Sequence, residues 1–239
     1  MRSRRDSSDR VASTAGTVPG EQAEQVIDPR IAYQDGTSKY DLKYAYRDAA
    51  VWQIETVDAQ DDVGWSPSLA LDNGGSPHIG YADSTNDTIK YAYRVASADK
   101  GPAGNGWQIE VVDDSAAWTG VSLALDGSGR PHLVYQGAAG LTYAYKDASA
   151  WHTEVVTGAE SCALFPKLAV DQAGQPHLVC YITGYPSVLN YAYRDAGSST
   201  WHRELVDQSN TDPYDDGGLT TIEIDPQGRP HILFRGYVD

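Results

Sequence analysis

A fourfold internal repeat constrains the fold of this chain more than any other feature of its sequence. Each copy contains Tyr-Ala-Tyr, then a tryptophan with a glutamate three residues later, then an apolar segment that ends in aspartate, and then a tight turn and Pro-His. The first tyrosines of the four copies are Tyr44, Tyr91, Tyr143 and Tyr191, at spacings of 47, 52 and 48 residues. A period of this length indicates an array of identical supersecondary units.

Each motif of the repeat has the pattern of a β-strand. The Tyr-Ala-Tyr motif (YAY strand) alternates, and the tryptophan motif (Trp strand) is rich in aromatic and β-branched residues. The apolar segment (LALD strand) and the Pro-His segment (Pro-His strand) form a hairpin pattern whose turn has a glycine suited to positive φ, which we expect at Gly74, Gly129, Gly174 and Gly228. Four short antiparallel strands in about 48 residues are typical of one propeller blade.

The number of strands tests how such a propeller closes. Residues Pro29–Tyr33 match the Pro-His strand, with Arg30 in place of the histidine, so this strand occurs five times and the other three occur four times. We therefore expect an all-β fold, a four-bladed β-propeller in which the C-terminal LALD and Pro-His strands join the N-terminal YAY and Trp strands in one composite blade. Such closure removes open sheet edges. An incomplete ring completed by oligomerisation, or five blades, is the alternative.

The repeat resembles that of bacterial β-propeller repeat proteins with the consensus SLALDxxGxPHIxY, YAYR and WxxExVD. The resemblance covers residues 26–239 and implies the propeller fold. It implies no activity, because this family has no single established one.

Charge and composition exclude several partners. The 239 residues carry a formal charge of −15, which disfavours nucleic acid and anionic membrane surfaces, and no apolar run is long enough to span a bilayer. Residues 1–25 are polar without an apolar signal segment, so we expect a disordered tail, a single domain over 26–239 and a cytoplasmic location. Cys162 and Cys180 should then be thiols at one end of a blade; packing as small residues is favoured, and redox pairing is the alternative.

Sequence variation between the copies indicates where a site lies. The loops from Trp strand to LALD strand and from Pro-His strand to YAY strand lie at one end of the blades and differ in every copy. We call this end the variable end. Its aromatic residues predict the walls of one central pocket, and its acids Asp215 and Asp216 are candidate catalytic groups. The predicted walls are Trp65, Trp118, Phe165 and Tyr214.

Residues that break the repeat inside strands are further candidates. In the LALD strands, Lys167 replaces a serine or threonine and Glu223 replaces an alanine, so we expect an inner pair that either acts in acid–base chemistry or is a structural ion pair. At the end of the Pro-His strands, Arg235 and Tyr181 stand where other copies have Ala82 and Gln136, and both are predicted to contact a substrate.

The histidines of the four Pro-His motifs occupy a repeated slot, so we expect a structural role, with bonds to nearby backbone or to the LALD aspartate. We predict no metal and no cofactor. Since the variable end does not repeat, one pocket for a small molecule is favoured, in a monomer or homo-oligomer. The favoured function is a cofactor-independent acid–base enzyme (lyase, isomerase, cyclase or hydrolase). A non-catalytic lectin-like or protein-interaction propeller is the alternative.

Overall fold

The computed structural model describes residues 29–36, 40–95, 106–114, 120–156, 162–182, 188–195, 197–208 and 220–234. The predicted N-terminal tail, residues 1–25, lies outside the described residues. Seventeen strands follow one another in the described parts, in the order that the motifs predict. No helix in these parts has the length and apolar character that crossing a bilayer requires.

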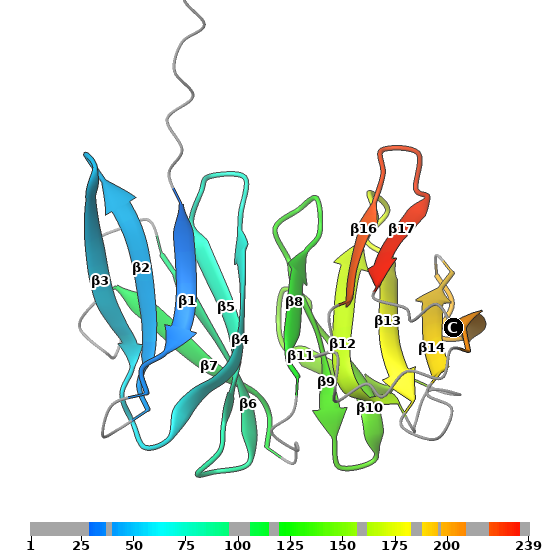
Figure 1. Cartoon of the computed structure of the whole chain (residues 1–239), viewed down its shortest axis with the longest axis horizontal. Coiled ribbons are helices and arrows are strands. Elements are labelled where there is room, and N and C mark those ends of the chain that lie inside the picture. The colour runs from blue at the N-terminus through cyan, green and yellow to red at the C-terminus, as the bar shows by residue number, and fades with distance from the viewer. Residues whose placement is uncertain are drawn as a thin grey trace, which may run out of the picture.

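The strands form antiparallel sheets, each built from consecutive strands (Figure 1). Sheet 1 lacks a LALD strand, sheets 2 to 4 have all four motifs, and a final hairpin has only the LALD and Pro-His strands. Sheet 1 contains β1 (Arg30–Gln34), β2 (Leu42–Asp48) and β3 (Val51–Asp58). Sheet 2 contains β4 (Val63–Leu71), β5 (Pro77–Asp83), β6 (Thr88–Arg94) and β7 (Trp107–Asp113). Sheet 3 contains β8 (Ser122–Leu125), β9 (Pro131–Gly137), β10 (Gly140–Lys146) and β11 (Trp151–Val155). Sheet 4 contains β12 (Cys162–Val170), β13 (Pro176–Ile182), β14 (Val188–Arg194) and β15 (Trp201–Asp207), and the hairpin contains β16 (Thr220–Ile224) and β17 (Pro230–Phe234).

The LALD strands of successive sheets lie next to one another, as β4, β8, β12 and β16. The small residue that opens this motif has a structural reason. The Ser68 hydroxyl of β4 accepts a hydrogen bond from the Leu123 backbone N–H of β8 (2.9 Å), and the Ser122 hydroxyl accepts one from Leu168 of β12 (3.1 Å). These bonds join the inner strands of neighbouring sheets.

The aspartate of each LALD motif shapes the turn to the Pro-His strand. The Asp126 carboxylate accepts hydrogen bonds from the backbone N–H groups of Ser128 (2.8 Å) and Arg130 (2.9 Å), and the other copies repeat this pattern. The predicted positive φ is confirmed at Gly129, Gly174 and Gly228. In the first copy the prediction is wrong by one residue, because Gly75 and not Gly74 has φ of 79°.

The hydrophobic core lies between neighbouring sheets rather than inside one. Between sheets 1 and 2, Leu42, Ile79 and Trp107 are fully buried in one cluster, and similar clusters separate the following sheets. Because side chains alternate across a strand, sheets 2 to 4 each present one face to the sheet before and the other face to the next sheet or the hairpin. Burial of these faces holds the array together.

The predicted composite blade is not formed. The hairpin β16–β17 packs against β12 and β13, and neither of its strands pairs with sheet 1. Strand β1 instead keeps its place on β2, where the Arg30 guanidinium donates to the Tyr44 hydroxyl (3.0 Å) and the Gln34 amide donates to the Val63 carbonyl (2.9 Å). The described strands therefore form an open array with sheet 1 at one end and the hairpin at the other (Figure 1).

Candidate functional site

Half of the site residues predicted from the sequence lie outside the described residues. These are the two candidate catalytic aspartates, two of the predicted aromatic wall residues and one basic residue. They are Asp215, Asp216, Trp118, Tyr214 and Arg235.

The two predicted inner-strand charges do not meet in the described structure. Lys167 is half-buried on β12, Glu223 is exposed on β16, and no ion pair or hydrogen bond joins them. Glu223 occupies the alanine position that faces the next inner strand in other sheets, and no further LALD strand follows β16 in the described chain. The open end of the array therefore explains its exposure.

The predicted aromatic walls have different environments. Trp65 on β4 is 40% exposed at the variable end, whereas Tyr181 is 6% exposed and packs in the core between sheet 4 and the hairpin. Phe165 lies in a β-bulge of β12 with φ of 48°, and Ser66 has φ of 46° in the matching bulge of β4. Non-glycine residues in this region carry backbone strain, which is enriched at functional sites.

The prediction of two thiols is wrong, because Cys162 of β12 and Cys180 of β13 form a disulfide. Their Cα atoms are 5.6 Å apart, which lies within the range that a disulfide bridges. The bulge at the start of β12 brings the two side chains together: the strand pairing shifts between Cys162 and Leu164, so the cysteines are not directly opposed. The thiols were predicted from an expected reducing compartment. The shift in strand pairing that places the two cysteines within reach of each other is not visible in the sequence.

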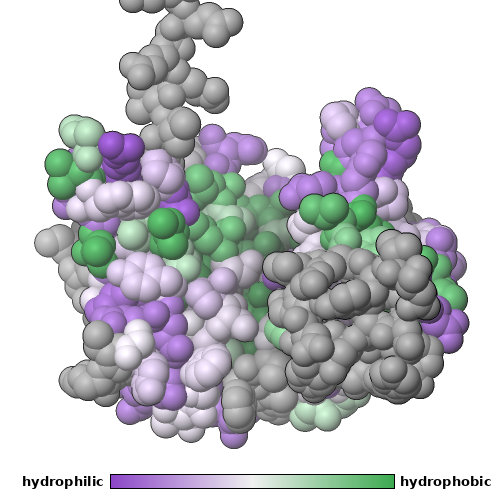
Figure 2. Space-filling model, viewed as in Figure 1, coloured by the Kyte–Doolittle hydropathy of each residue, from purple (hydrophilic) through white to green (hydrophobic). Residues whose placement is uncertain are grey.

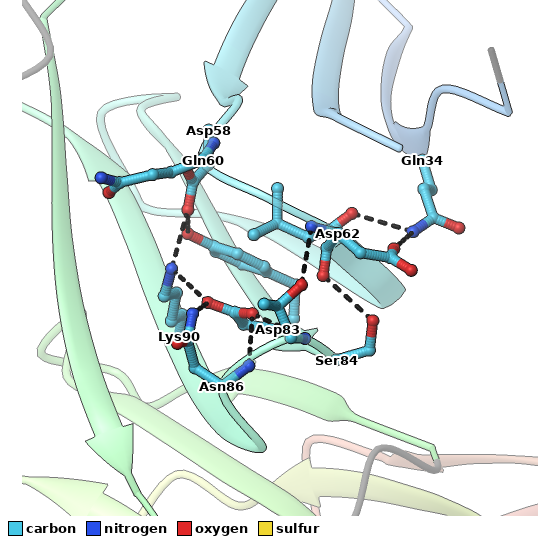
Figure 3. A network of polar contacts seen from close by, with 11 residues as sticks. Gln34, Asp58, Gln60, Asp62, Asp83, Ser84, Asn86 and Lys90 are labelled. Atoms are coloured by element: carbon cyan, nitrogen blue, oxygen red, sulfur yellow. Dashed lines mark hydrogen bonds and ion pairs between the residues drawn. The ribbon is translucent and has the colours of Figure 1, made fainter. Parts of the chain in front are cut away.

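The best-ordered polar arrangement at the variable end is centred on Asp62, in the loop between β3 and β4 (Figure 3). Its carboxylate oxygen Oδ1 accepts hydrogen bonds from Gln34 of β1 (3.2 Å) and from the indole N–H of Trp65 (3.1 Å). Its backbone is held by Ser84 and Thr85 of the β5–β6 turn. Three segments that are distant in the sequence thus fix one carboxylate beside an exposed indole ring.

A buried ionic network lies next to Asp62 and ties the same loops together (Figure 3). Lys90 of β6 pairs with Asp83 (2.7 Å) and Asp58 (3.3 Å), and Asp58 also accepts a hydrogen bond from the Tyr81 hydroxyl (2.8 Å). Asn86 donates to Asp83 (2.9 Å). The network joins the end of β3 to β5 and β6, so it supports the loop that carries Asp62.

The charges of this network are fixed rather than poised for proton transfer. Burial alone would raise the pKa of Asp83, but hydrogen bonds from Lys90 and Asn86 outweigh burial and hold it below its usual value. Burial alone would lower the pKa of Lys90, but Asp83 and Asp58 raise it. Burial, and then the Asp58 charge, raise the pKa of Tyr81 well above normal. Near neutral pH, Lys90 is therefore a cation, Asp83 an anion and Tyr81 a neutral phenol.

Sequence reasoning missed this network although a signal was available. The residue before the YAY motif is Lys43, Lys90, Thr142 or Asn190 in the four copies, so it breaks the repeat. The position of Asp83 is occupied by Asp35, Gly137 and Ile182 in the other copies. The Lys–Asp combination therefore occurs in two of the four copies, as Lys43 with Asp35 and Lys90 with Asp83.

The histidines of the Pro-His motif are structural in sheets 2 to 4. The Nδ1 atom of His132 lies 2.5 Å from the Tyr143 hydroxyl, and its Nε2 atom is 3.6 Å from the Asp126 carboxylate. Burial lowers the pKa of His132 to about 4, against a smaller opposing effect of Asp126. The predicted aspartate is thus a neighbour, whereas the main partner is the first tyrosine of the YAY motif, as it also is for His78 and His177.

A hollow of about 210 Å³ lies on sheet 3, away from Asp62, and its lining includes Asp113, Thr142 and Glu154. Its carboxylates are already engaged. Asp113 accepts a hydrogen bond from the Tyr135 hydroxyl (2.8 Å), and Glu154 pairs with Arg194 (2.7 Å). The Asp62–Trp65 surface is the stronger candidate site, because it combines a fixed carboxylate with an exposed ring.

Comparison with known proteins supports the fold and leaves the function open. No family model matches the sequence, and no curated protein matches it. A protein of unknown function from Dyadobacter fermentans is 12% identical with a TM-score of 0.52, over 83% of this chain and 65% of that chain. AofleA from Arthrobotrys oligospora is 12% identical with a TM-score of 0.53, over 77% of this chain and 54% of that chain. A fucose lectin from Kordia zhangzhouensis is 20% identical over 58% of this chain and 96% of that chain, with a TM-score of 0.40.

Proposed function

We propose that this chain is a propeller-type protein that binds a polyhydroxylated small molecule, such as a sugar, at the Asp62–Trp65 surface. The observation that carries the proposal is a carboxylate held rigidly beside a tryptophan ring that is 40% exposed. Small-molecule sites combine apolar surface with a few well-placed polar groups that fix orientation. Asp62 and Trp65 supply one of each.

The hydrogen bonds of Asp62 support a ligand-accepting role. Gln34 and Trp65 both donate to Oδ1, and Oδ2 has no hydrogen-bond partner among the described residues. An ionised carboxylate oxygen accepts hydroxyl hydrogen bonds, which are stronger than bonds between neutral groups. Because the indole N–H is directed to Asp62, the ring can present its face to the C–H groups of a sugar ring.

Backbone strain around the site gives independent support. Asp61 has φ of 70° and Ser66 has φ of 46°, so left-handed residues flank the segment from Asp62 to Trp65 on both sides. Such conformations cost of order 1–3 kcal/mol each and persist where the surroundings enforce them. The network of Asp58, Asp83 and Lys90 beneath the loop provides that enforcement.

The test is a calorimetric titration with a panel of methyl glycosides, with tetramethylammonium as a probe for a cationic ligand. For a glycoside that binds, Trp65→Ala and Asp62→Asn should each weaken binding at least 10-fold, and Trp65→Phe should restore part of it. Asp195→Asn, an exposed acid at the opposite end of the sheets, is the matched control and should leave binding unchanged. Glycoside binding that survives both site variants would refute the proposal, and binding of tetramethylammonium alone would replace it with a cation site.

Acid–base catalysis by Glu223 and Lys167 stays a prediction from the sequence. No described contact supports their cooperation, so the proposal is limited to binding.

The predicted cytoplasmic location is likewise untested. The Cys162–Cys180 disulfide is of a kind that persists in oxidising compartments, and it favours such a compartment over the cytoplasm.

A further inference from the structure

Neighbouring sheets are joined by one polar junction that occurs three times in the described chain. In each junction, the glutamate of one Trp strand accepts hydrogen bonds from two residues of the next sheet, namely the basic residue that ends its YAY motif and the tryptophan of its Trp strand, through the indole N–H. Glu154, for example, accepts from Arg194 (2.7 Å) and Trp201 (3.1 Å). The other two sets are Glu110 with Lys146 (2.6 Å) and Trp151 (2.9 Å), and Glu55 with Arg94 and Trp107 (3.3 Å).

An aromatic contact accompanies each of these junctions. The first tyrosine of the YAY motif meets the tryptophan of the next sheet edge to face. The pairs are Tyr44–Trp107 (5.3 Å between ring centroids), Tyr91–Trp151 (5.3 Å) and Tyr143–Trp201 (5.4 Å). A complete junction thus consists of a tyrosine and a glutamate on one sheet, and a tryptophan and a basic residue on the next.

Sheet 1 exposes the tryptophan and basic half of this junction. Trp52 is 47% exposed, although its equivalent Trp107 is fully buried, and Ile54 on the same face is 62% exposed. Arg47, the basic residue that ends the first YAY motif, is exposed and makes no ion pair among the described residues. No sheet precedes sheet 1 in the described chain, so this apolar and cationic face is uncovered.

Sheet 4 carries the tyrosine and glutamate half, in which Glu204 is exposed and Tyr191 is 7% exposed, packed beside Ile222 of the hairpin. Glu204 has no ion pair within the described part of the chain. Val206 on the same face of β15 is 37% exposed, whereas its equivalents Val57, Val112 and Val156 are buried at 1%, 7% and 0%. The hairpin β16–β17 covers only the inner part of this face, through contacts with β12 and β13.

We propose that these two half-junctions join between two copies of this chain, head to tail. Glu204 of one copy pairs with Arg47 and with the Trp52 indole N–H of a second copy, and Trp52 packs edge to face on Tyr191. The residues of the two halves match those of the three junctions already formed in charge, in residue type and in sequence position, and three of the four (Arg47, Trp52 and Glu204) are exposed. Such heterologous contacts close a ring of copies where the rotation between them allows it.

A second copy fits better than closure within one chain. No pairing joins sheet 1 to sheet 4 or to the hairpin within the chain, and the two ends lie on opposite sides of Figure 1. Figure 2 shows apolar surface in the hollow between these two halves of the molecule, which an added sheet would cover. This chain spans 65% and 54% of the two solved structures to which it is similar.

The inner strands agree with this arrangement. Sheet 1 lacks a LALD strand, and β16 of another copy can supply it beside β1. Both β1 and β17 are Pro-His strands, and the joined sheet has only one place for such a strand, between β16 and β2. One of the two must therefore be displaced from that place when the copies join. Strand β17 is held more weakly, because Leu233 is 72% exposed and the His231 side chain is 65% exposed, whereas β1 is anchored to Tyr44 and Asp62.

The test uses charge reversal and sedimentation equilibrium over a wide range of protein concentration. Wild-type protein should associate, and both Arg47→Glu and Glu204→Arg should remain monomeric with unchanged far-UV circular dichroism. An equimolar mixture of the two single variants should associate again, because each can offer an intact end to the other. Gln53→Glu, on the opposite face of β3 from Trp52, is the control and should associate like wild type.

Each other outcome overturns the proposal. In one such outcome, wild type is monomeric at every concentration, each single variant lowers the melting temperature and the double variant Arg47→Glu/Glu204→Arg restores it. That result would mean that the two ends close within one chain. If the single variants associate as wild type does, or if their mixture stays monomeric while wild type associates, the junction between Arg47 and Glu204 is not the contact.

Discussion

The glutamate junction between sheets permits a stability prediction with an internal control. Glu154 accepts charge-assisted bonds from Arg194 (2.7 Å) and from Trp201 (3.1 Å), and the Glu154 and Arg194 side chains are only 28% and 15% exposed. Replacing Glu154 by alanine leaves a mostly buried guanidinium and an indole N–H without their acceptor. Charge-assisted bonds contribute about 1.5–3 kcal/mol each, and partial solvation replaces some of that. We expect Glu154→Ala to cost about 2 kcal/mol.

Glu204 occupies the same repeat position and has no ion-pair partner among the described residues, so Glu204→Ala should cost less than about 0.5 kcal/mol in dilute, monomeric protein. Urea unfolding of both variants measures this difference, and the corresponding fall in melting temperature for Glu154→Ala is about 4–8 °C for a domain of this size. Equal losses for the two variants would refute the reasoning, because they would mean that the observed contacts contribute nothing beyond the residue type.

The remaining predictions concern His132, the disulfide and Glu223. His132→Ala should destabilise the protein by about 1–3 kcal/mol in urea unfolding by removing the partner of the buried Tyr143 hydroxyl. The folded-state pKa of His132, about 4, is below the unfolded value of 6.5, so its contribution is complete above pH 6.5 and is lost as the pH falls toward 4. Denaturation curves across this window should show a loss of stability that His132→Gln reduces, while His78 and His177 account for part of the remainder. Replacing Cys162 and Cys180 by serine should cost about 3 kcal/mol, as should reduction by dithiothreitol, and a reductant that leaves the melting temperature unchanged would contradict the disulfide. Glu223→Gln should abolish any turnover if the sequence-based catalytic prediction is right, and turnover at the wild-type rate would remove Glu223 from the site.

The repeat made the local fold predictable. The order of all seventeen strands follows from the motifs, because each motif has its own alternation and its own turn chemistry. The histidine slot was also predictable as structural, since a residue repeated in every copy serves a purpose common to all copies. Its partner was not, because the hydroxyl of Tyr143 reaches His132 through strand pairing that the sequence does not display.

How the array closes could not be predicted from the sequence, because two strands compete for the place next to the first YAY strand, β2. Both β1 and β17 match the Pro-His strand, and the choice depends on side-chain contacts such as Gln34 with Asp62. The candidate site was found only in part for a related reason. Trp65 was predicted from its place at the variable end, whereas the Lys90–Asp83 pair that supports its loop depends on side-chain contacts between β5 and β6 that the sequence does not display.

The most direct test of the proposed binding site is ¹⁹F NMR of protein that contains 5-fluorotryptophan. The chain has six tryptophans, and Trp65→Phe assigns the resonance of Trp65. On titration with a methyl glycoside that binds, we predict a saturable shift of the Trp65 resonance, alone or together with that of Trp118, which the sequence predicts at the same end. In the Asp62→Asn variant, we predict that the shift requires at least 10-fold more glycoside. A shift confined to Trp52, Trp107, Trp151 or Trp201 would contradict the account, and so would binding that moves no tryptophan resonance.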